Sequence, residues 1–270
     1  MEVKELKKIA NDNRKRIVDM VYRAKVGHVG GALSVIDLVT AISELDIDYS
    51  SPNRSRIVLS KGHACPALYA ELVQKGILEE SELNTFRRLN SRLQGHPYTQ
   101  DIPELDATTG LLGQGFSMAV GMAIVKKQYD KEHRVYAIAG DGEMDEGQMW
   151  EAIMMAAHNK LNNLIFIIDY NKLSSTHPTN EIINLEPLVE KMKAFNLHTI
   201  EIDGNNMEEI VRALDEAKQV ADKPIAIVAN TVKGKGVSFM ENVGKWHSSG
   251  LTDEEYKIAM EDLNRIEEAL

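Results

Sequence analysis

The sequence predicts an α/β fold, a doubly wound and mostly parallel sheet with helices on both of its faces. From about residue 116 onward, short apolar segments alternate regularly with segments of helical periodicity. The apolar segments, such as LIFIID, are continuous runs, which are typical of parallel strands buried on both sides. Regular alternation of strands and helices favours the same arrangement. Because we find no repeat, linker or domain boundary, we expect a single domain over residues 1–270 with an N-terminal helical extension.

The amino-terminal part should contribute helices and one strand. Apolar residues at helical spacing predict a first helix that stops at Gly27: Leu6, Ile9, Ile17, Val21 and Ala24. Residues 32–45 and 63–76 indicate two further helices, the second with a C-terminal glycine stop. A short buried strand is expected between them, at 56–60. The stretch 89–114 is rich in Gly, Pro, Thr and Gln, and such long irregular segments in compact domains are usually functional.

The remaining elements alternate in order. Strands are predicted over residues 134–139, 163–169, 198–202 and 224–230. Helices are predicted over residues 116–129, 146–159, 187–195 and 207–221. The last segment, residues 251–270, should form a helix opened by a capping box between Thr252 and Glu255.

Composition limits the classes of function. The net charge of -10 gives a nucleic-acid role no electrostatic support. Cys65 is the only cysteine, so no intrachain disulfide can form, which fits a reducing compartment. Residues 1–25 are charged throughout and do not resemble a signal peptide, and no apolar run is long enough to cross a bilayer. We therefore expect a cytoplasmic protein that acts neither on nucleic acid nor in a membrane.

A polar motif follows the predicted strand at 134–139. It is Gly140-Asp141-Gly142, and Asn171 follows the next predicted strand. Ligands of parallel sheets gather outside the carboxyl ends of the strands. Carboxylate and amide oxygens suit Mg²⁺ or Ca²⁺, while a glycine lets backbone N–H groups approach an anion closely. Gly-Asp-Gly alone would be read as a turn, but together with the asparagine it predicts a site for a metal ion and a diphosphate.

These residues and several other segments resemble a known family. The Gly-Asp-Gly triplet, 28 further residues and Asn171 are similar to the thiamine diphosphate motif. Five segments resemble, in order, the successive signatures of transketolase: AKVGHVGG (24–31), SKGHACPALYA (60–70), GHP (95–97), TTGLLGQG (108–115) and GDGEMDEGQMWEA (140–152). The resemblance covers the amino-terminal, diphosphate-binding half of transketolase, which implies the thiamine diphosphate-binding fold. Such halves occur in split transketolases, which need a second polypeptide.

The resemblance implies roles for particular residues. Mg²⁺, or Ca²⁺, would be held by Asp141, Asn171 and the carbonyl of Leu173. Thiamine diphosphate would be contacted by His63, Gly110, Leu112, Gly142 and Glu143, besides Asp141 and Asn171. The catalytic histidines would be His28, His96 and His247, of which His247 has the weakest local match. Acidic residues at the subunit interface would be Glu146 and Glu151.

The expected function is that of the diphosphate-binding subunit of a thiamine diphosphate-dependent transketolase. It would transfer a two-carbon ketol unit from a ketose phosphate to an aldose phosphate. A second subunit would carry the pyrimidine-binding and carboxy-terminal domains, giving a homodimer or heterotetramer, and this chain alone would be inactive. The alternatives are a subunit of a 2-oxo-acid dehydrogenase or decarboxylase, a deoxyxylulose-phosphate synthase, or a non-catalytic binding subunit. One departure from the family pattern is Val29, where proline is common.

Overall fold

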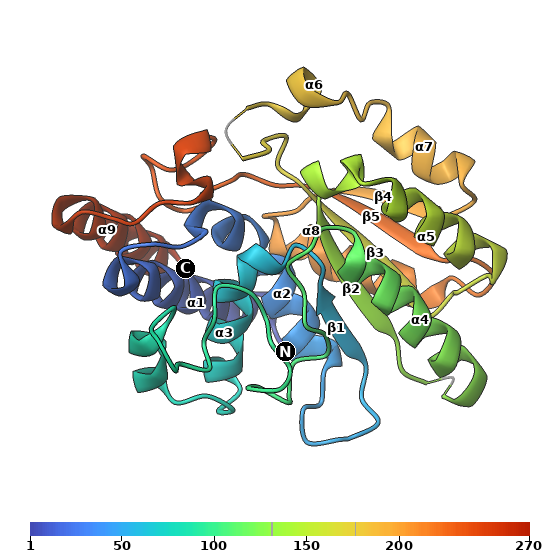
Figure 1. Cartoon of the computed structure of the whole chain (residues 1–270), viewed down its shortest axis with the longest axis horizontal. Helices are drawn as coiled ribbons and strands as arrows, with labels where there is room; N and C mark the ends of the chain where they lie inside the picture. The colour runs from blue at the N-terminus through green and yellow to red at the C-terminus, as the bar shows by residue number, and fades with distance from the viewer. Residues whose placement is uncertain (131, 176) are drawn as a thin grey trace.

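A computed structural model describes residues 1–130, 132–175 and 177–270. Its centre is one sheet of parallel strands in the order β1-β2-β3-β5-β4 (Figure 1). The strands are β1 (Arg56–Leu59), β2 (Val135–Gly140), β3 (Leu164–Tyr170), β4 (His198–Asp203) and β5 (Ile225–Asn230). The parallel α/β fold predicted from the continuous apolar runs is therefore confirmed, and each strand lies within a residue or two of its expected position.

The α-helices are α1 (Val3–Ala24), α2 (Val29–Asp46), α3 (Cys65–Gln74), α4 (Gln114–Tyr129), α5 (Gly147–His158), α6 (Thr179–Ile182), α7 (Leu188–Ala194), α8 (Met207–Gln219) and α9 (Asp253–Ala269). Short 3₁₀ turns are η1 (Gly62–Ala64), η2 (Glu80–Thr85), η3 (Gly142–Asp145) and η4 (Gly244–His247). The capping box between Thr252 and Glu255 is present. Two boundaries were wrong: the first helix ends at Ala24 and the second already begins at Val29, whereas α5 lies within one residue of its predicted range. Neither η2 nor α6 was predicted.

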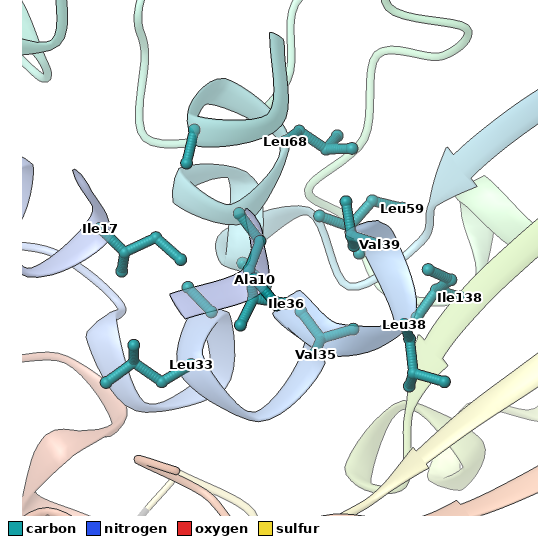
Figure 2. Close-up of a cluster of buried hydrophobic side chains, with 14 of the residues drawn as sticks. Ala10, Ile17, Leu33, Val35, Ile36, Leu38, Val39, Leu59, Leu68 and Ile138 are labelled. Atoms are coloured by element: carbon teal, nitrogen blue, oxygen red, sulfur yellow. The ribbon is translucent and has the colours of Figure 1, made fainter. Parts of the chain in front are cut away.

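Helices cover both faces of the sheet, so it is doubly wound. One apolar layer joins α1, α2, α3, α8 and α9 to strand residues such as Tyr136 and Ile138. Figure 2 shows part of this layer, where side chains of α2 meet Leu59 of β1 and Ile138 of β2. The other layer joins α4, α5 and α7 to the alternate strand residues, including Ala137 and Ala139. Both faces are covered, which explains why the inner strands β2, β3 and β5 are buried at nearly every position.

The carboxyl ends of β1, β2 and β3 bring three distant segments together. Because these strands are adjacent and parallel, residues just after each one meet at the same edge of the sheet. The backbone of Gly62, after β1, packs so closely on the segment 109–110 that a Cβ there would lie 2.6 Å from the Thr109 hydroxyl oxygen. Helix α2 is buried along most of its length, which fixes His28 at its amino-terminal end above the same edge.

Within the described ranges, no helix has both the length and the apolar character needed to cross a membrane.

Candidate active site

A cavity of about 400 Å³ opens at the carboxyl edge of the sheet. Every residue that the sequence predicted for the site contributes to its lining: His28, His63, His96, Gly110, Leu112, Asp141, Gly142, Glu143, Asn171, Leu173 and His247. They come from segments separated by up to 219 positions in the chain, from His28 to His247. The structure thus collects the predicted residues around one cavity, while their individual roles remain predictions.

The predicted metal ligands lie at the ends of β2 and β3. Asp141 is 2 % exposed, and its carboxylate accepts hydrogen bonds from the N–H groups of Gly142 (2.8 Å) and Lys172 (2.5 Å). The Asn171 side-chain oxygen accepts one from the N–H of Leu173, at 3.1 Å. Burial, reinforced by the nearby Asp169, raises the pKa of Asp141 to about 7. A cation bound here would offset that cost by stabilising the charged carboxylate.

The same edge has room for an anion next to these oxygens. A Cβ placed on Gly142 would meet nothing closer than the Ser174 hydroxyl oxygen, at 3.5 Å. The space beside Gly142 is therefore open to a ligand, and Gly142, whose N–H donates to the Asp141 carboxylate in this structure, lines the cavity. The Nδ1 atom of His28, which also lines the cavity, is buried and has no hydrogen-bond partner among the described residues. A diphosphate with a hard divalent cation fits this donor set.

No group of three or more His, Cys, Asp or Glu side chains in the described ranges is arranged to hold a metal ion. The predicted donors are instead one carboxylate, one amide and one backbone carbonyl.

A buried ion pair that the sequence did not reveal lies beneath the cavity. The ammonium group of Lys61, 2 % exposed, contacts the carboxylate of Asp169, which is fully buried. Asp169 also accepts hydrogen bonds from the hydroxyls of Ser34 and Thr231. From the sequence, Asp169 was expected only as the end of a strand, and Lys61 only as part of the segment SKGHACPALYA (60–70). The one available signal was a charged residue at the end of an otherwise apolar run.

Lys233 is the second buried cation at the cavity, and it was also missed. Its ammonium group donates to the carbonyl oxygen of Leu173 at 2.9 Å and also contacts that of Ser174. It lies 3.4 Å from Nδ1 of His247. Burial lowers the pKa of Lys233 to about 8, and the positive charge of Lys61 acts in the same direction. Lys233 belongs to the segment TVKGKG (231–236), where glycine and lysine spacing was the only hint.

Glu143 connects three segments around the cavity. Its carboxylate accepts hydrogen bonds from the Ser60 hydroxyl (2.5 Å), the Gly113 N–H (2.8 Å) and the Gly140 N–H (3.2 Å). The side chain is 2 % exposed, and burial raises its pKa. The resemblance implied contact with the cofactor for this residue. In the structure its carboxylate oxygens are occupied by these protein donors, so it acts first as a brace for the cavity wall.

Four imidazoles cluster in the same cavity. The ring of His28 lies 5.1 Å from that of His63, 5.3 Å from that of His247 and 6.2 Å from that of His96, measured between centroids. Burial lowers the pKa of His28 and of His247 to about 4, helped by the charges of Arg87 and Lys233 respectively. Burial also lowers the pKa of His63 and of His96. All four rings are therefore neutral at neutral pH, and each can donate one hydrogen bond and accept another.

A family model described as the thiamine diphosphate binding domain of transketolase matches residues 5–265. The chain belongs to this family. It is 43 % identical over 266 residues to the 6-deoxy-6-sulfo-D-fructose transketolase subunit of a Clostridium species, covering 97 % of each chain. It is 39 % identical over 274 residues to an apulose-4-phosphate transketolase subunit from Phocaeicola vulgatus, covering 99 % of this chain and 97 % of that relative.

A solved structure shows the same relationship in three dimensions. The crystal structure of transketolase from Campylobacter jejuni superimposes with a TM-score of 0.91 at 33 % identity, over 98 % of this chain but only 43 % of that one. The chain therefore spans less than half of this transketolase, yet nearly the whole of the two relatives that are separate transketolase subunits. The predicted family, the thiamine diphosphate-binding fold and the split type of subunit are confirmed.

Proposed function

We propose that this chain is the diphosphate- and Mg²⁺-binding subunit of a split transketolase, which transfers a two-carbon ketol unit from a ketose phosphate to an aldose phosphate. The observation that carries the proposal is the single cavity in which one carboxylate, one amide, a glycine-rich turn and four neutral imidazoles converge. In this proposal, residues 1–270 form one thiamine diphosphate-binding domain with an N-terminal helical extension, and the protein is cytoplasmic.

Each group in the cavity then has a task. Asp141, Asn171 and the Leu173 carbonyl hold the metal ion, Mg²⁺ or Ca²⁺, which neutralises the diphosphate. His63 and the Gly142 N–H bind the diphosphate, and the backbone of Gly110 and Leu112 supports the ring system. The bound cofactor supplies the carbon nucleophile, which the protein only positions and polarises.

The remaining imidazoles face the sugar. His28, His96 and His247 are neutral, so each can accept a proton from a sugar hydroxyl or donate one to a carbonyl oxygen as the bond to carbon breaks or forms. Their clustering within about 6 Å of His28, together with their low pKa values, supports this division of labour.

The partner subunit would cover α4 and α5. These helices pack side by side, since Gln114 donates to Gln148 at 2.6 Å and Gln148 donates to Ser117 at 2.7 Å. Large apolar side chains are exposed on these helices and just before α4, and we call this set the outer face: Leu111, Met118, Val125, Met154 and Met155. Exposed apolar side chains of this kind are typical of interaction sites. Glu146 and Glu151 are exposed at α5 as well, and the proposed assembly is a homodimer or heterotetramer completed by the second subunit.

The experiment is reconstitution. We expect a complex of this chain with a subunit carrying the pyrimidine-binding domain to show ketol transfer that depends on thiamine diphosphate and Mg²⁺. The isolated chain should be inactive, because it provides only the diphosphate end of the site. A complex that binds the cofactor but forms no new ketose from any ketose and aldose pair would refute the proposed function, and an isolated chain with full activity would refute the need for a partner.

A further inference from the structure

Asn171 can bind a metal ion in only one of the two orientations of its side-chain amide. The amide oxygen is a ligand for a hard cation, whereas the amide nitrogen carries two hydrogens and is not. The two atoms exchange places when the terminal torsion angle turns by half a turn, and the side chain itself restricts this torsion only weakly. The place of Asn171 directly after β3 therefore does not determine which atom faces the cavity. Hydrogen bonds to neighbouring groups decide it.

Two neighbours select the orientation in which the oxygen is available. The N–H of Leu173 donates to Oδ1 of Asn171 at 3.1 Å. On the other side of the amide, Nδ2 of Asn171 donates to the Oδ2 atom of Asp169 at 3.4 Å, a long contact to a charged acceptor. In the reversed orientation the amide oxygen would face the Asp169 carboxylate, and the amide nitrogen would face the Leu173 N–H. Both contacts would then be repulsive, so the observed orientation is favoured twice.

Asp169 is itself held in place by donors from three other segments. The residue is fully buried. Its Oδ2 atom accepts a hydrogen bond from the Ser34 hydroxyl of α2 at 2.7 Å and contacts the Lys61 ammonium group, which follows β1. Its Oδ1 atom accepts from the hydroxyl of Thr231, which follows β5. An asparagine here would offer one acceptor oxygen instead of two. The carboxylate can therefore satisfy these donors and still present a charge to Asn171.

We propose that Asp169 is a positioning residue, which turns the amide of Asn171 so that its oxygen faces the metal ion. Asp169 acts through Asn171, because it is not among the described residues that line the cavity, whereas Asn171 is. Outer partners of this kind orient metal ligands, and their loss commonly weakens metal binding by about ten-fold to a hundred-fold. The inference rests on the proposed function, since it takes Asn171 as a ligand of the metal ion.

The test measures affinity for Mg²⁺, which does not require turnover. The complex of this chain with its partner subunit is titrated calorimetrically with Mg²⁺ in the presence of thiamine diphosphate. We expect Asp169→Asn to weaken Mg²⁺ binding by at least about ten-fold, because the amide of Asn171 loses the charge that orients it. The control is Asp203→Asn, which removes an exposed carboxylate at the end of β4, outside the cavity lining, and should behave as wild type. Unchanged affinity in Asp169→Asn would overturn the proposal.

A double-variant comparison separates orientation of the amide from general damage to the fold. In Asn171→Ala the amide is absent, so Asp169 has nothing to orient. We therefore expect Asp169→Asn to cause little further loss of Mg²⁺ affinity when Asn171→Ala is already present. A loss by the same factor in both backgrounds would show that Asp169 acts on the fold alone, and it would refute the inference.

An exchange of the two residues provides a rescue. The double variant Asp169→Asn with Asn171→Asp keeps the net charge, and a carboxylate at position 171 offers the metal an oxygen in either orientation. We expect it to bind Mg²⁺ more tightly than Asp169→Asn. It should also bind more tightly than Asn171→Asp alone, in which two carboxylates face each other. This second comparison decides even if Asp169→Asn alone does not fold, and equal affinities in it would contradict the proposed contact.

Turnover distinguishes this inference from the proposed function. A wild-type complex that binds Mg²⁺ and thiamine diphosphate but transfers no ketol unit would contradict the proposed function, while the coupled loss in the variants would still support the role of Asp169. Conversely, an active complex whose Mg²⁺ affinity is unchanged by Asn171→Ala would refute the inference and leave the transketolase activity in place.

Discussion

The cavity at the carboxyl edge of the sheet and the outer face near α4 and α5 are opposite kinds of surface; we call the buried carboxylates Asp141, Glu143 and Asp169 the floor of the cavity. On the floor, the buried charges Asp141, Glu143 and Asp169 each have partners supplied by this chain. On the outer face, Met118, Val125 and Met154 are 37 %, 56 % and 53 % exposed. Burying charge without partners is costly, and so is leaving a large apolar surface in water. In the proposed assembly, this chain supplies the diphosphate end of the site and a second chain supplies the other end.

Removing one carboxylate from the floor should have the largest effect. We expect Asp141→Ala to weaken Mg²⁺-dependent binding of thiamine diphosphate by at least about a hundred-fold, since the metal loses its charged ligand. The measurement is calorimetric titration of the reconstituted complex. The matched control is Asp145→Ala, which removes a carboxylate from the same turn but not from the cavity lining. Unchanged affinity in the Asp141 variant, with the fold intact, would contradict the metal assignment.

A charge on the outer face should separate the subunits without unfolding this one. The double variant Met118→Glu with Met154→Glu is expected to weaken association with the partner by about ten-fold or more, because two carboxylates would be buried in an apolar contact. The melting temperature of the isolated chain should change little, as both side chains are exposed. Ile183→Glu, an equally exposed position away from α4 and α5, serves as the control. Sedimentation of mixtures measures the effect, and normal assembly would show that the partner does not bind at the outer face.

A variant of Glu143 tests whether the buried carboxylates of the cavity also stabilise the fold. Glu143→Gln replaces an oxygen acceptor by an amide donor facing the donors Ser60, Gly113 and Gly140. We expect the free energy of unfolding to fall by about 2 kcal/mol, since a buried donor loses its acceptor. Urea denaturation of the isolated chain measures it, with the exposed Glu151→Gln as the control. Equal stability of both variants would mean that these hydrogen bonds contribute nothing net.

A buried carboxyl far from the cavity gives the smallest effect, visible as a dependence on pH. Glu71 accepts a hydrogen bond from Asn13 at 2.7 Å, and its other oxygen is buried without a partner. Burial, and then the charge of Glu44, raises the pKa of Glu71 from 4.5 to about 8. The native state therefore binds more protons than the unfolded state between these values, so stability should fall as pH rises through that window.

The variant Glu71→Gln cannot lose this proton, and it should be less sensitive to pH. The free energy of unfolding is measured by urea denaturation at about pH 5 and about pH 9. Between these values it should fall by at least about 1 kcal/mol more in the wild type than in the variant. Lys75→Gln is a useful control because it changes the neighbouring ion pair with Glu44 without removing the buried carboxyl. Identical pH profiles for wild type and Glu71→Gln would show that Glu71 is ionised in the folded protein throughout.

The sequence by itself determined the fold class, the family and the residues that would surround the cavity. Those features are local. A run such as LIFIID marks a buried parallel strand wherever it occurs, and Gly140-Asp141-Gly142 fixes a tight turn at a strand end. Because the strands are parallel, residues that follow them must meet at one edge, so the position of Asn171 relative to Asp141 could be foreseen.

The tertiary structure alone decided which charges are paired. Lys61 and Asp169 are 108 positions apart, and Glu143 braces segments up to 83 positions away. Such contacts depend on the order of strands in the sheet, β1-β2-β3-β5-β4, which no local pattern encodes. Periodicity and motifs report the preferences of neighbouring residues, whereas pairing and burial of charge are set by chain segments that meet only in the folded protein.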